Sequence, residues 1–552
     1  MTFFRMRRGA RALAFATLLG AGLGLGLAGC ASGPTRPAGW SAPQALVAPS
    51  PFAGVHGLAV DGKGRLLAGS VVGNTMWEVD RRTGQARVFI DAPEGQADDI
   101  AVGPRGELAW TNYLMGMLRY REHDGAPLQV LAQDLPGLNS LDFDRRNGKL
   151  YASQVFLGDA LWEIDRSGRN PPRLIRKDLG GFNGFEVGPD GLLYGPLWFK
   201  GQVVKIDPAS GALTVIADGF KIPAAANLDG KGNLWVVDTR TGELVKVALA
   251  DGRKTVVARL EPSLDNLAIA PDGTVYVSNM ANNAIDAVDP ATGTRRRLTG
   301  SPVAVPAGLR IDGRTLWVAD VFGFREVDTA SGQVRDVFRM QRDPALEYPF
   351  AVGVSASRFA LASWFTGTVQ VVDRTGRRTL HTLHGLKAPY DALPLDDGSV
   401  VYTELGAGTV TRASGPDFAQ RTVLASGLQG PLQLARDGAG QLYVSEAAGR
   451  VLRLVPGAAP VTVASGLAMP EGLAFTPWGS LVVAETAARR LTEIDMASGS
   501  RRTVAENLPI GMAGGPGMPP PYVPTGVAVG EDGSIYYSAD RDNGIYRIRP
   551  AR

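Results

Sequence analysis

The chain is built from one sequence unit of about 42 residues that recurs twelve times. Each copy has a small residue, an alternating apolar stretch, a tight turn with Asp-Gly or Gly-x-Gly, and a second alternating stretch, as in VHGLAVDGKGRLLAGS. Two more alternating stretches usually follow, as in VVKIDPASGALTVIA. Alternation with a period of two between Gly and Asp turns is typical of β-hairpins. The unit therefore predicts four antiparallel strands, which is the content of one β-propeller blade.

The number of copies indicates how the blades are grouped. Aligned on Gly57, the copies follow each other at 39 to 44 residues, except for one interval of 54 before Gly526. A single propeller usually holds roughly four to eight blades. We therefore predict an all-β protein of tandem six-bladed β-propellers, with residues 43–301 in the first ring and 302–552 in the second. One ring of twelve blades is the alternative.

Three segments depart from the repeat. The last copy stops after its third predicted strand, at Ile548, and residues 43–47 offer a strand that could close the second ring. The long interval reflects an insertion at Ile510–Pro521, and a shorter one lies at Arg342–Tyr348. Both insertions connect the fourth strand of one blade to the first strand of the next. We expect them to cover the mouth of the second ring, where loops often determine specificity.

The first 29 residues predict a signal peptide, because a basic start is followed by a short apolar run and small residues. The ending Leu27-Ala28-Gly29-Cys30 resembles the bacterial lipobox, in which the signal is cut before a cysteine that then carries lipid. By this resemblance we expect lipidation at Cys30, a tether over residues 30–42 and a place in the cell envelope. Ala31 after the cysteine favours the outer membrane, with the protein facing the periplasm or the surface. An ordinary signal with a chance cysteine is the alternative.

Composition excludes several classes of protein. Cys30 is the only cysteine, which rules out a disulfide framework and a multi-thiolate metal site. Losing the four arginines of the signal changes the formal charge from +3 to −1, so no basic field remains to attract nucleic acid. The content of 45% hydrophobic and 20% charged residues argues against wholesale disorder. We expect a monomer that contacts the membrane only through its lipid.

The fold predicts which side chains meet at the mouth of each ring. The first strand of a blade begins, and the second ends, at the same face. The residue before each anchor and the residue about fourteen positions later should therefore converge. In the first ring these positions hold mostly oxygen-bearing groups, which suit a calcium-type cation. The first set is His56, Asp98, Asn139, Asn183, Ala224 and Asp265, and the second includes Ser70, Asn112, Asp238 and Asn279.

The second ring has a different pattern. Its first positions are largely apolar or aromatic, namely Ala307, Phe350, Tyr390, Leu432, Glu471 and Thr525. Together with the second positions they give a candidate pocket of Asp320, Glu404, Glu446, Glu471 and Glu485. Two carboxylates about 6 Å apart repel each other by roughly 3 kcal/mol at an effective dielectric constant near 20. Such a set would need a cation, an arginine or lysine, or raised pKa values. For both rings, a plain solvated rim is the alternative interpretation.

The frame x-G-L-A-V-D-x-x-G-x-L-Y-V resembles the six-bladed propellers of the gluconolactonase and senescence marker protein superfamily, and NHL-repeat proteins and virginiamycin B lyase are similar in appearance. In the lactonases, Glu, two Asn and Asp at the first positions of blades one, three, four and five hold a calcium-like ion. Asn139 and Asn183 match the two asparagines. His56 and Ala224 stand where the acids would be, and Asp265, one blade on, is a candidate replacement. The His and Glu pair of the lyase is not reproduced.

The resemblance implies an envelope-anchored hydrolase of a lactone or ester that uses a divalent cation, calcium by analogy. Asn139, Asn183 and Asp265 would be metal ligands, and Asp98 or Asp265 would be the general base. His56 is the one histidine placed for catalysis, and no G-x-S-x-G motif or cysteine nucleophile supports an acyl-enzyme. The alternative is a non-catalytic scaffold that binds a small molecule or an envelope protein. A lyase of the virginiamycin B type is a third hypothesis.

Overall fold

The computed structural model describes residues 35–343 and 345–551 and consists of twelve four-stranded antiparallel sheets. The predicted all-β fold class is confirmed. Eleven sheets contain four strands that are consecutive in the chain, and the twelfth has the order β1-β48-β47-β46. In the described part of the chain, no helix has the length and apolar character needed to cross a membrane. Cys30 and the predicted signal peptide lie outside the described residues.

The first ring contains six blades of four strands each. They are β2 Val55–Val60, β3 Leu66–Ser70, β4 Thr75–Val79, β5 Ala86–Ile90; β6 Ile100–Val102, β7 Leu108–Asn112, β8 Met117–Arg121, β9 Gln129–Ala132; β10 Leu138–Phe143, β11 Leu150–Gln154, β12 Ala160–Ile164, β13 Arg173–Lys177; β14 Glu186–Val187, β15 Leu193–Leu197, β16 Gln202–Ile206, β17 Leu213–Ala217; β18 Pro223–Leu228, β19 Asn233–Asp238, β20 Glu243–Ala248, β21 Lys254–Arg259; and β22 Leu264–Ile269, β23 Val275–Asn279, β24 Ala284–Val288, β25 Arg295–Thr299.

The second ring contains the other six blades, the last of which includes the strand nearest the N-terminus. They are β26 Pro306–Asp312, β27 Thr315–Asp320, β28 Gly323–Asp328, β29 Val334–Arg339; β30 Ala351–Val354, β31 Arg358–Ser363, β32 Thr368–Asp373, β33 Arg378–Leu383; β34 Pro389–Pro394, β35 Val400–Glu404, β36 Thr409–Ser414, β37 Gln420–Ala425; β38 Pro431–Arg436, β39 Leu442–Glu446, β40 Arg450–Arg453, β41 Val461–Ala464; β42 Pro470–Phe475, β43 Leu481–Glu485, β44 Arg490–Ile494, β45 Arg501–Ala505; and β46 Val527–Val529, β47 Ile535–Ala539, β48 Gly544–Ile548, β1 Gln44–Val47. Short 3-10 turns lie at Pro416–Phe418 and Thr486–Ala488.

Each ring closes on itself. The innermost strand of the first blade, β2, contacts β22 of the sixth, and β26 contacts β46 and β47 of the twelfth. A single ring of twelve blades is therefore excluded. The strand β1 pairs antiparallel with β48, with Val47 opposite Ile545. The second ring is thus completed by joining the two ends of the chain, and Val47 is buried against the neighbouring blade.

The inner strands are apolar because neighbouring blades cover both of their faces, whereas the outer strands are partly exposed. The strand β3 is buried at all five positions, while β13 is mostly exposed. Close packing between blades explains the small residues of the repeat. A Cβ atom on Gly69 of β3 would lie 2.0 Å from the backbone oxygen of Ala97 in the next blade, so only glycine fits there.

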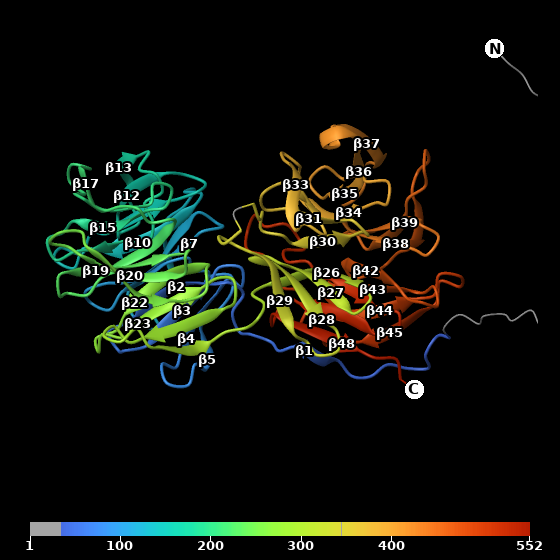
Figure 1. Ribbon diagram of the computed structural model, residues 1–552, viewed down its shortest axis with the longest axis horizontal. Helices are drawn as coiled ribbons and strands as arrows, with labels where there is room; N and C mark the ends of the chain where they lie inside the picture. The colour runs from blue at the N-terminus through green and yellow to red at the C-terminus, as the bar shows by residue number, and fades with distance from the viewer. Residues whose placement is uncertain (1–34, 344, 552) are drawn as a thin grey trace, which may run out of the picture.

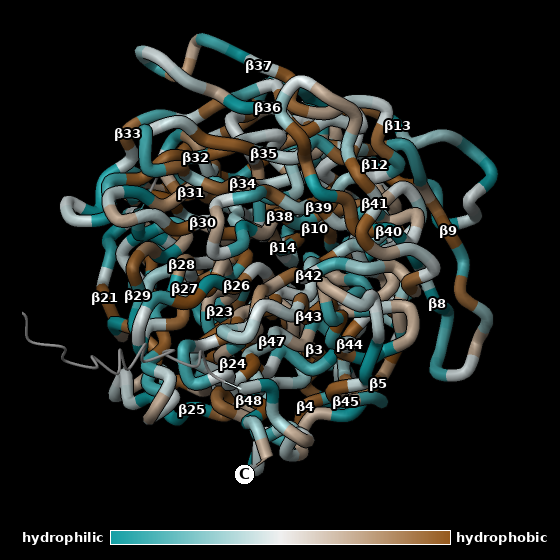
Figure 2. The backbone as a smooth tube through the Cα atoms, turned by 90° about the vertical axis from the view of Figure 1, so that its right-hand side faces the viewer, coloured by the Kyte–Doolittle hydropathy of each residue, from teal (hydrophilic) through white to brown (hydrophobic). Residues whose placement is uncertain are grey.

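The two rings are stacked face to face. Figure 1 shows them as two bodies along the long axis of the molecule, and Figure 2 looks along that axis. In Figure 2 the inner strands β26, β30, β34, β38 and β42 surround the centre, and β10 and β14 of the first ring lie in the same central region. Residues from the mouths of both rings line one cavity, so the two mouths point toward each other.

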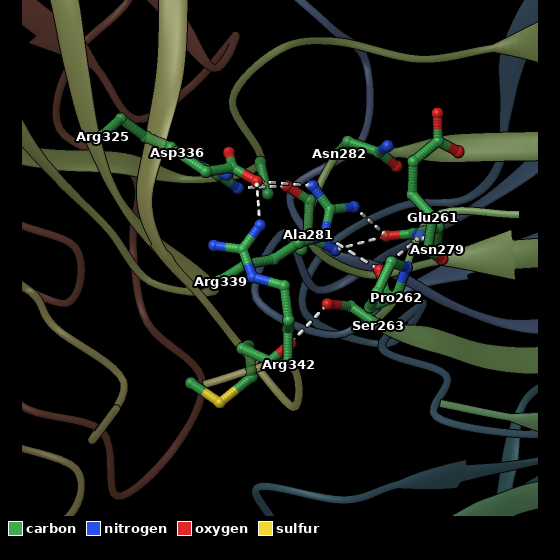
Figure 3. Close-up of polar contacts among 12 residues, drawn as sticks. Glu261, Pro262, Ser263, Asn279, Ala281, Asn282, Arg325, Asp336, Arg339 and Arg342 are labelled. Carbon is green, nitrogen blue, oxygen red and sulfur yellow. Dashed lines mark hydrogen bonds and ion pairs between the residues drawn. The ribbon is translucent and has the colours of Figure 1, made fainter. Parts of the chain in front are cut away.

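Buried arginines join the rings at one side (Figure 3). Arg339 of β29 donates hydrogen bonds to the backbone oxygen of Pro262 at 2.9 Å and to Oδ1 of Asn279 at 3.0 Å. Arg325 of β28 is fully buried and donates to the backbone oxygen of Ala281 at 2.5 Å. Burial, and then the charge of Arg325, lower the pKa of Arg339 to about 9. These contacts hold the seventh blade against the fifth and sixth.

Candidate functional site

A chamber lies between the two rings, at the mouth of the first. Its volume is about 90 Å³, whereas a single water needs roughly 10–15 Å³. The chamber is therefore large enough for a small ligand. Twelve lining residues come from the first ring and eight from the second. They are His56, Val71, Val72, Asp98, Tyr113, Leu114, Asn139, Phe156, Asn183, Trp198, Asp265 and Met280, with Val321, Phe322, Gln341, Tyr348, Phe350, Trp364, Phe365 and Tyr522.

The floor of the chamber is formed by first-strand positions of the first ring. The structure brings together His56, Asp98, Asn139, Asn183 and Asp265. Each lies just before or at the start of the innermost strand of its blade, which explains why five segments far apart in sequence meet at one opening. Ala224, the sixth position, is 1% exposed and packs in an apolar cluster with Trp198 and Trp235. The catalytic and metal-binding roles of these residues remain predictions.

Asp98 and Asp265 are two acids with no lysine or arginine beside them. Burial raises the pKa of Asp98 well above its usual range, the charge of Asp265 raises it further, and a hydrogen bond from Asn139 opposes this effect. Burial likewise raises the pKa of Asp265, and the nearby His56 opposes this effect. Among the described residues no lysine or arginine acts on the charge of either acid, and none lines the chamber. The two carboxyl groups therefore stay protonated to a higher pH than ordinary aspartates.

His56 presents an acceptor to the chamber. The side chain is 7% exposed, and its Nδ1 lies 2.9 Å from the backbone oxygen of Gly54. A carbonyl oxygen only accepts, so Nδ1 carries the proton and Nε2 of the neutral ring has a free lone pair. Within the described residues Nε2 has no hydrogen-bond partner. The imidazole packs on Phe322 of the second ring, with 5.3 Å between ring centres.

The two asparagines have their oxygens turned into the wall. Oδ1 of Asn183 accepts from the backbone N–H of Gly184 at 3.0 Å, and it lies 2.9 Å from Oγ of Ser140. Oδ1 of Asn139 lies at the same distance from that hydroxyl. Because the Gly184 N–H can only donate, the orientation of the Asn183 amide is fixed. The asparagines therefore present their N–H groups, and not their oxygens, on the chamber side. Nδ2 of Asn139 donates to Asp98, and Nδ2 of Asn183 lies opposite the oxygen that faces Ser140.

This arrangement does not fit the calcium-like ion that the family resemblance implies. Calcium takes six to eight oxygen ligands. Of the two amide oxygens that would supply a pair of them, that of Asn183 accepts from the Gly184 N–H, and both lie 2.9 Å from the single hydroxyl of Ser140. Within residues 35–343 and 345–551, no group of three or more His, Cys, Asp or Glu side chains is arranged to hold a metal ion.

Aromatic side chains form the walls and roof. From the first ring, Phe156 packs edge-on against Trp198 at 5.0 Å between ring centres. From the second ring, Phe322 meets Tyr348 at 6.0 Å, and Trp364 meets Tyr522 at 5.9 Å. The roof therefore belongs to the second ring, and the chamber exists only because the rings are stacked.

Both insertions noted in the sequence contribute to this roof. Tyr348 ends the segment Arg342–Tyr348, and Tyr522 directly follows the segment Ile510–Pro521. The backbone oxygen of Tyr522 accepts a hydrogen bond from Nε1 of Trp364 at 3.1 Å. Tyr390, at a first-strand position of the second ring, lies with its hydroxyl 3.4 Å from the backbone oxygen of Pro521. The second insertion thus covers the mouth of the second ring and supplies a residue to the chamber.

The residues that end the second strands do not converge on the mouth, which corrects the expectation from the sequence. Each instead bonds the loop that leads into its own blade. Asp238 accepts from the backbone N–H groups of Lys221 and Ile222, and Oγ of Ser70 accepts from that of Ala53. Asn112 and Asn279 donate to backbone oxygens of the equivalent loops. A polar residue here holds the blade together and need not mark a site.

The second-ring acids follow the same rule. Glu404, Glu446, Glu485 and Asp320 accept from backbone N–H groups of Lys387, Gln429, Ala468 and Val305, respectively. The last three also pair with Arg450, Arg490 and Arg325. The structure therefore does not gather these four into one pocket, because their lone pairs are used within their own blades. For Glu446, Glu485 and Asp320, an arginine of the third strand supplies the positive charge that a buried carboxylate needs.

Glu471 is the exception, since it occupies a first-strand position. It is 1% exposed and accepts from Oγ1 of Thr486 and from the backbone N–H of Thr525, both at 2.7 Å. Burial, with a contribution from the charge of Asp540, raises the pKa of Glu471 to about 8. Burial raises the pKa of Asp540 to about 6. This pair lies beneath the second insertion, where Asp540 accepts from the backbone of Gly511 and Met512.

The sequence interpretation missed the aromatic walls. A signal for them is present in the turns that follow the second strands, which read NYLMG, QVFLG and LWFKG in the first ring and DVFG and SWFTG in the second. Each turn carries at least one aromatic residue within two positions of the strand end. Because these turns lie at the mouths of the rings, at least one aromatic side chain of each turn reaches the chamber.

Comparison with known proteins yields no close relative. No protein-family model matches the chain, and no curated protein sequence matches it. Among solved structures, the chain is similar to a nidogen/laminin complex at 16% identity, covering 41% of this chain and 91% of the other, with a TM-score of 0.25. It is also similar to selenomethionine-substituted virginiamycin B lyase from Staphylococcus aureus at 14% identity, covering 59% and 94%, with a TM-score of 0.25.

Proposed function

We propose that this protein binds a small molecule in the chamber between its two rings. The observation that carries the proposal is that a cavity floored by five convergent polar residues is closed by aromatic residues of the other ring. An apolar pocket with a few placed polar groups is the usual form of a ligand site. This is the ligand-binding alternative of the sequence analysis, with the first ring supplying the polar groups and the second the apolar cover.

Filling the chamber tests this proposal. Leu114 lines the chamber and is only partly buried, so a Leu114→Trp variant should fold while its larger ring takes up ligand space. Leu174→Trp on the outer strand β13, where the side chain is 40% exposed, is the matched control. Calorimetric titration with benzyl alcohol and benzylamine should give saturable binding of at least one compound to wild type and the control, and at least about tenfold weaker binding to Leu114→Trp. If neither compound binds, or if both tryptophan variants bind like wild type, the chamber is not the site.

A calcium titration separates this function from a metal-dependent lactonase. Because the amide oxygens of Asn139 and Asn183 face Ser140, we expect no saturable calcium binding that depends on Asn183. Calorimetry on wild type and Asn183→Ala should therefore give the same trace. Saturable binding to wild type that disappears in Asn183→Ala would contradict our assignment of the amide orientation and restore the hydrolase hypothesis.

We also propose, from the sequence, that Cys30 carries the lipid that places the two rings in the cell envelope. The support is the resemblance of Leu27-Ala28-Gly29-Cys30 to a lipobox and the absence of any other cysteine in the chain. Labelling of growing cells with a radioactive fatty acid should label the wild-type protein and should not label a Cys30→Ser variant. Equal labelling of the two proteins, or no labelling of the wild type, would contradict lipidation at Cys30.

A further inference from the structure

The chemistry of the chamber narrows the class of ligand, if the proposed binding function holds. Three acceptors line its floor: the carboxyl groups of Asp98 and Asp265, and Nε2 of His56, whose Nδ1 proton is directed to Gly54. Asp98 and His56 are more than nine-tenths buried. A floor with these acceptors and with no lysine or arginine among its lining residues favours a ligand that brings hydrogen-bond donors and positive charge.

The walls favour the same charge. Faces of Trp, Tyr and Phe rings attract cations through their quadrupole, and more strongly where water is excluded. Trp198, Tyr348, Trp364 and Tyr522 line the chamber together with four phenylalanines. Burial raises the pKa values of Tyr113 and Tyr348, so their hydroxyls remain neutral. Aromatic walls around an acid pair form an environment that stabilises an organic cation and also packs against its apolar part.

We propose that the chamber binds a small primary amine in its protonated form. The three N–H donors of an ammonium group match the three acceptors of Asp98, Asp265 and His56. The apolar or aromatic body of the amine would pack against the second-ring residues Phe322, Tyr348 and Trp364. The donor groups of Asn139 and Asn183 would meet an acceptor on the ligand, such as a hydroxyl or carboxylate. The first ring thus recognises charge, and the second ring recognises the apolar body.

The proposal is tested with benzylamine and its neutral analogue benzyl alcohol, and with benzoate as the anion. Calorimetric titration of the mature protein should give benzylamine an affinity at least about tenfold above that of benzyl alcohol, which corresponds to about 1.4 kcal/mol, and no binding of benzoate. The double variant Asp98→Asn/Asp265→Asn keeps the shape of the floor and removes the charge. It should lose the preference for the amine while still binding benzyl alcohol.

The outcomes separate this inference from the function on which it rests. Equal binding of amine and alcohol by wild type, or an unchanged preference in the double variant, overturns the inference and leaves the chamber as a binding site. If neither benzylamine nor benzyl alcohol binds to wild type, or if Leu114→Trp binds them as wild type does, both the inference and the proposed function are overturned. Misfolding is checked by thermal melting, and the variant should melt at or above the wild-type temperature because two buried, repelling acids become neutral amides.

The affinity for the amine should also depend on pH. The groups that act on the acid pair are His56, Asp99, Tyr113 and Tyr348. Since burial raises the pKa values of Asp98 and Asp265, protons compete with the amine at a higher pH than for exposed aspartates. Binding of benzylamine should therefore tighten as the pH is raised from the acid range, and this dependence should be weaker in the double variant, which keeps only one of the three acceptors. A flat profile in wild type would contradict the role of the carboxylates.

Discussion

Replacing Arg325 by methionine is expected to destabilise the protein by about 3–5 kcal/mol. The guanidinium is fully buried and bonds Asp320, Asp336 and the backbone oxygen of Ala281 across the ring interface. Its removal leaves the carboxylate of Asp320, also fully buried, without its compensating charge. Such uncompensated buried charges are among the most destabilising single changes known in proteins. The variant also loses one of the hydrogen bonds that hold the seventh blade on the first ring.

Differential scanning calorimetry measures this effect. For a unit of roughly 250 residues, 3 kcal/mol corresponds to a fall in melting temperature of at least about 6 °C. The matched control is Arg335→Met, because Arg335 is 67% exposed and its nearest carboxylate, on Glu326, is 3.8 Å away. Exposed pairs contribute less than about 1 kcal/mol. Equal melting temperatures of Arg325→Met and Arg335→Met would show that Arg325 does not stabilise the ring interface.

Val47→Asp is expected to open the second ring. Val47 is 3% exposed and pairs with Ile545, and it is the most deeply buried residue of the strand that completes the twelfth blade. Burying a carboxylate among Leu309, Val318 and Val327 without a partner should cost at least about 3 kcal/mol. Because the variant strand can leave the sheet and expose its charge to water, the loss should appear as increased amide exchange in β48 and earlier melting of the second ring.

Ala45→Asp provides the comparison within the same strand. Ala45 pairs with Tyr546 but is exposed, so its substitution should change the melting temperature little. Hydrogen exchange followed by mass spectrometry would locate the loss of protection to the twelfth blade. Equal protection of β48 in wild type and Val47→Asp would mean that pairing of the chain ends does not support the ring.

Much of the fold could be predicted because the repeat has two independent signals. Alternation of period two predicts strands, and the recurrence of Gly57 and its equivalents predicts equal blades. Closure of each ring then follows from the usual limit on blade number. The same logic placed His56, Asp98, Asn139, Asn183 and Asp265 at a common mouth, because the innermost strands of all blades start at the same face.

The rest of the site could not be predicted, for a physical reason. Periodicity describes each ring but carries no information about how two rings stack. The sequence therefore could not show that Phe322, Trp364 and Tyr522 of the second ring cover the mouth of the first ring. Residue type alone also does not separate acids that face a cavity from acids that bond their own backbone. Glu446 and Glu485 look like site residues in the sequence, yet each accepts from a loop N–H and pairs with an arginine four or five residues later.

The most direct test of our account is to locate a ligand between the rings. Crystals of the mature protein soaked with 4-bromobenzylamine would reveal the bromine by its anomalous scattering. We predict a bromine peak among Phe322, Tyr348 and Trp364, with the amine nitrogen against Asp98 and Asp265. Bromine found only outside the chamber, for example on the outer strands of the blades, would contradict the central claim.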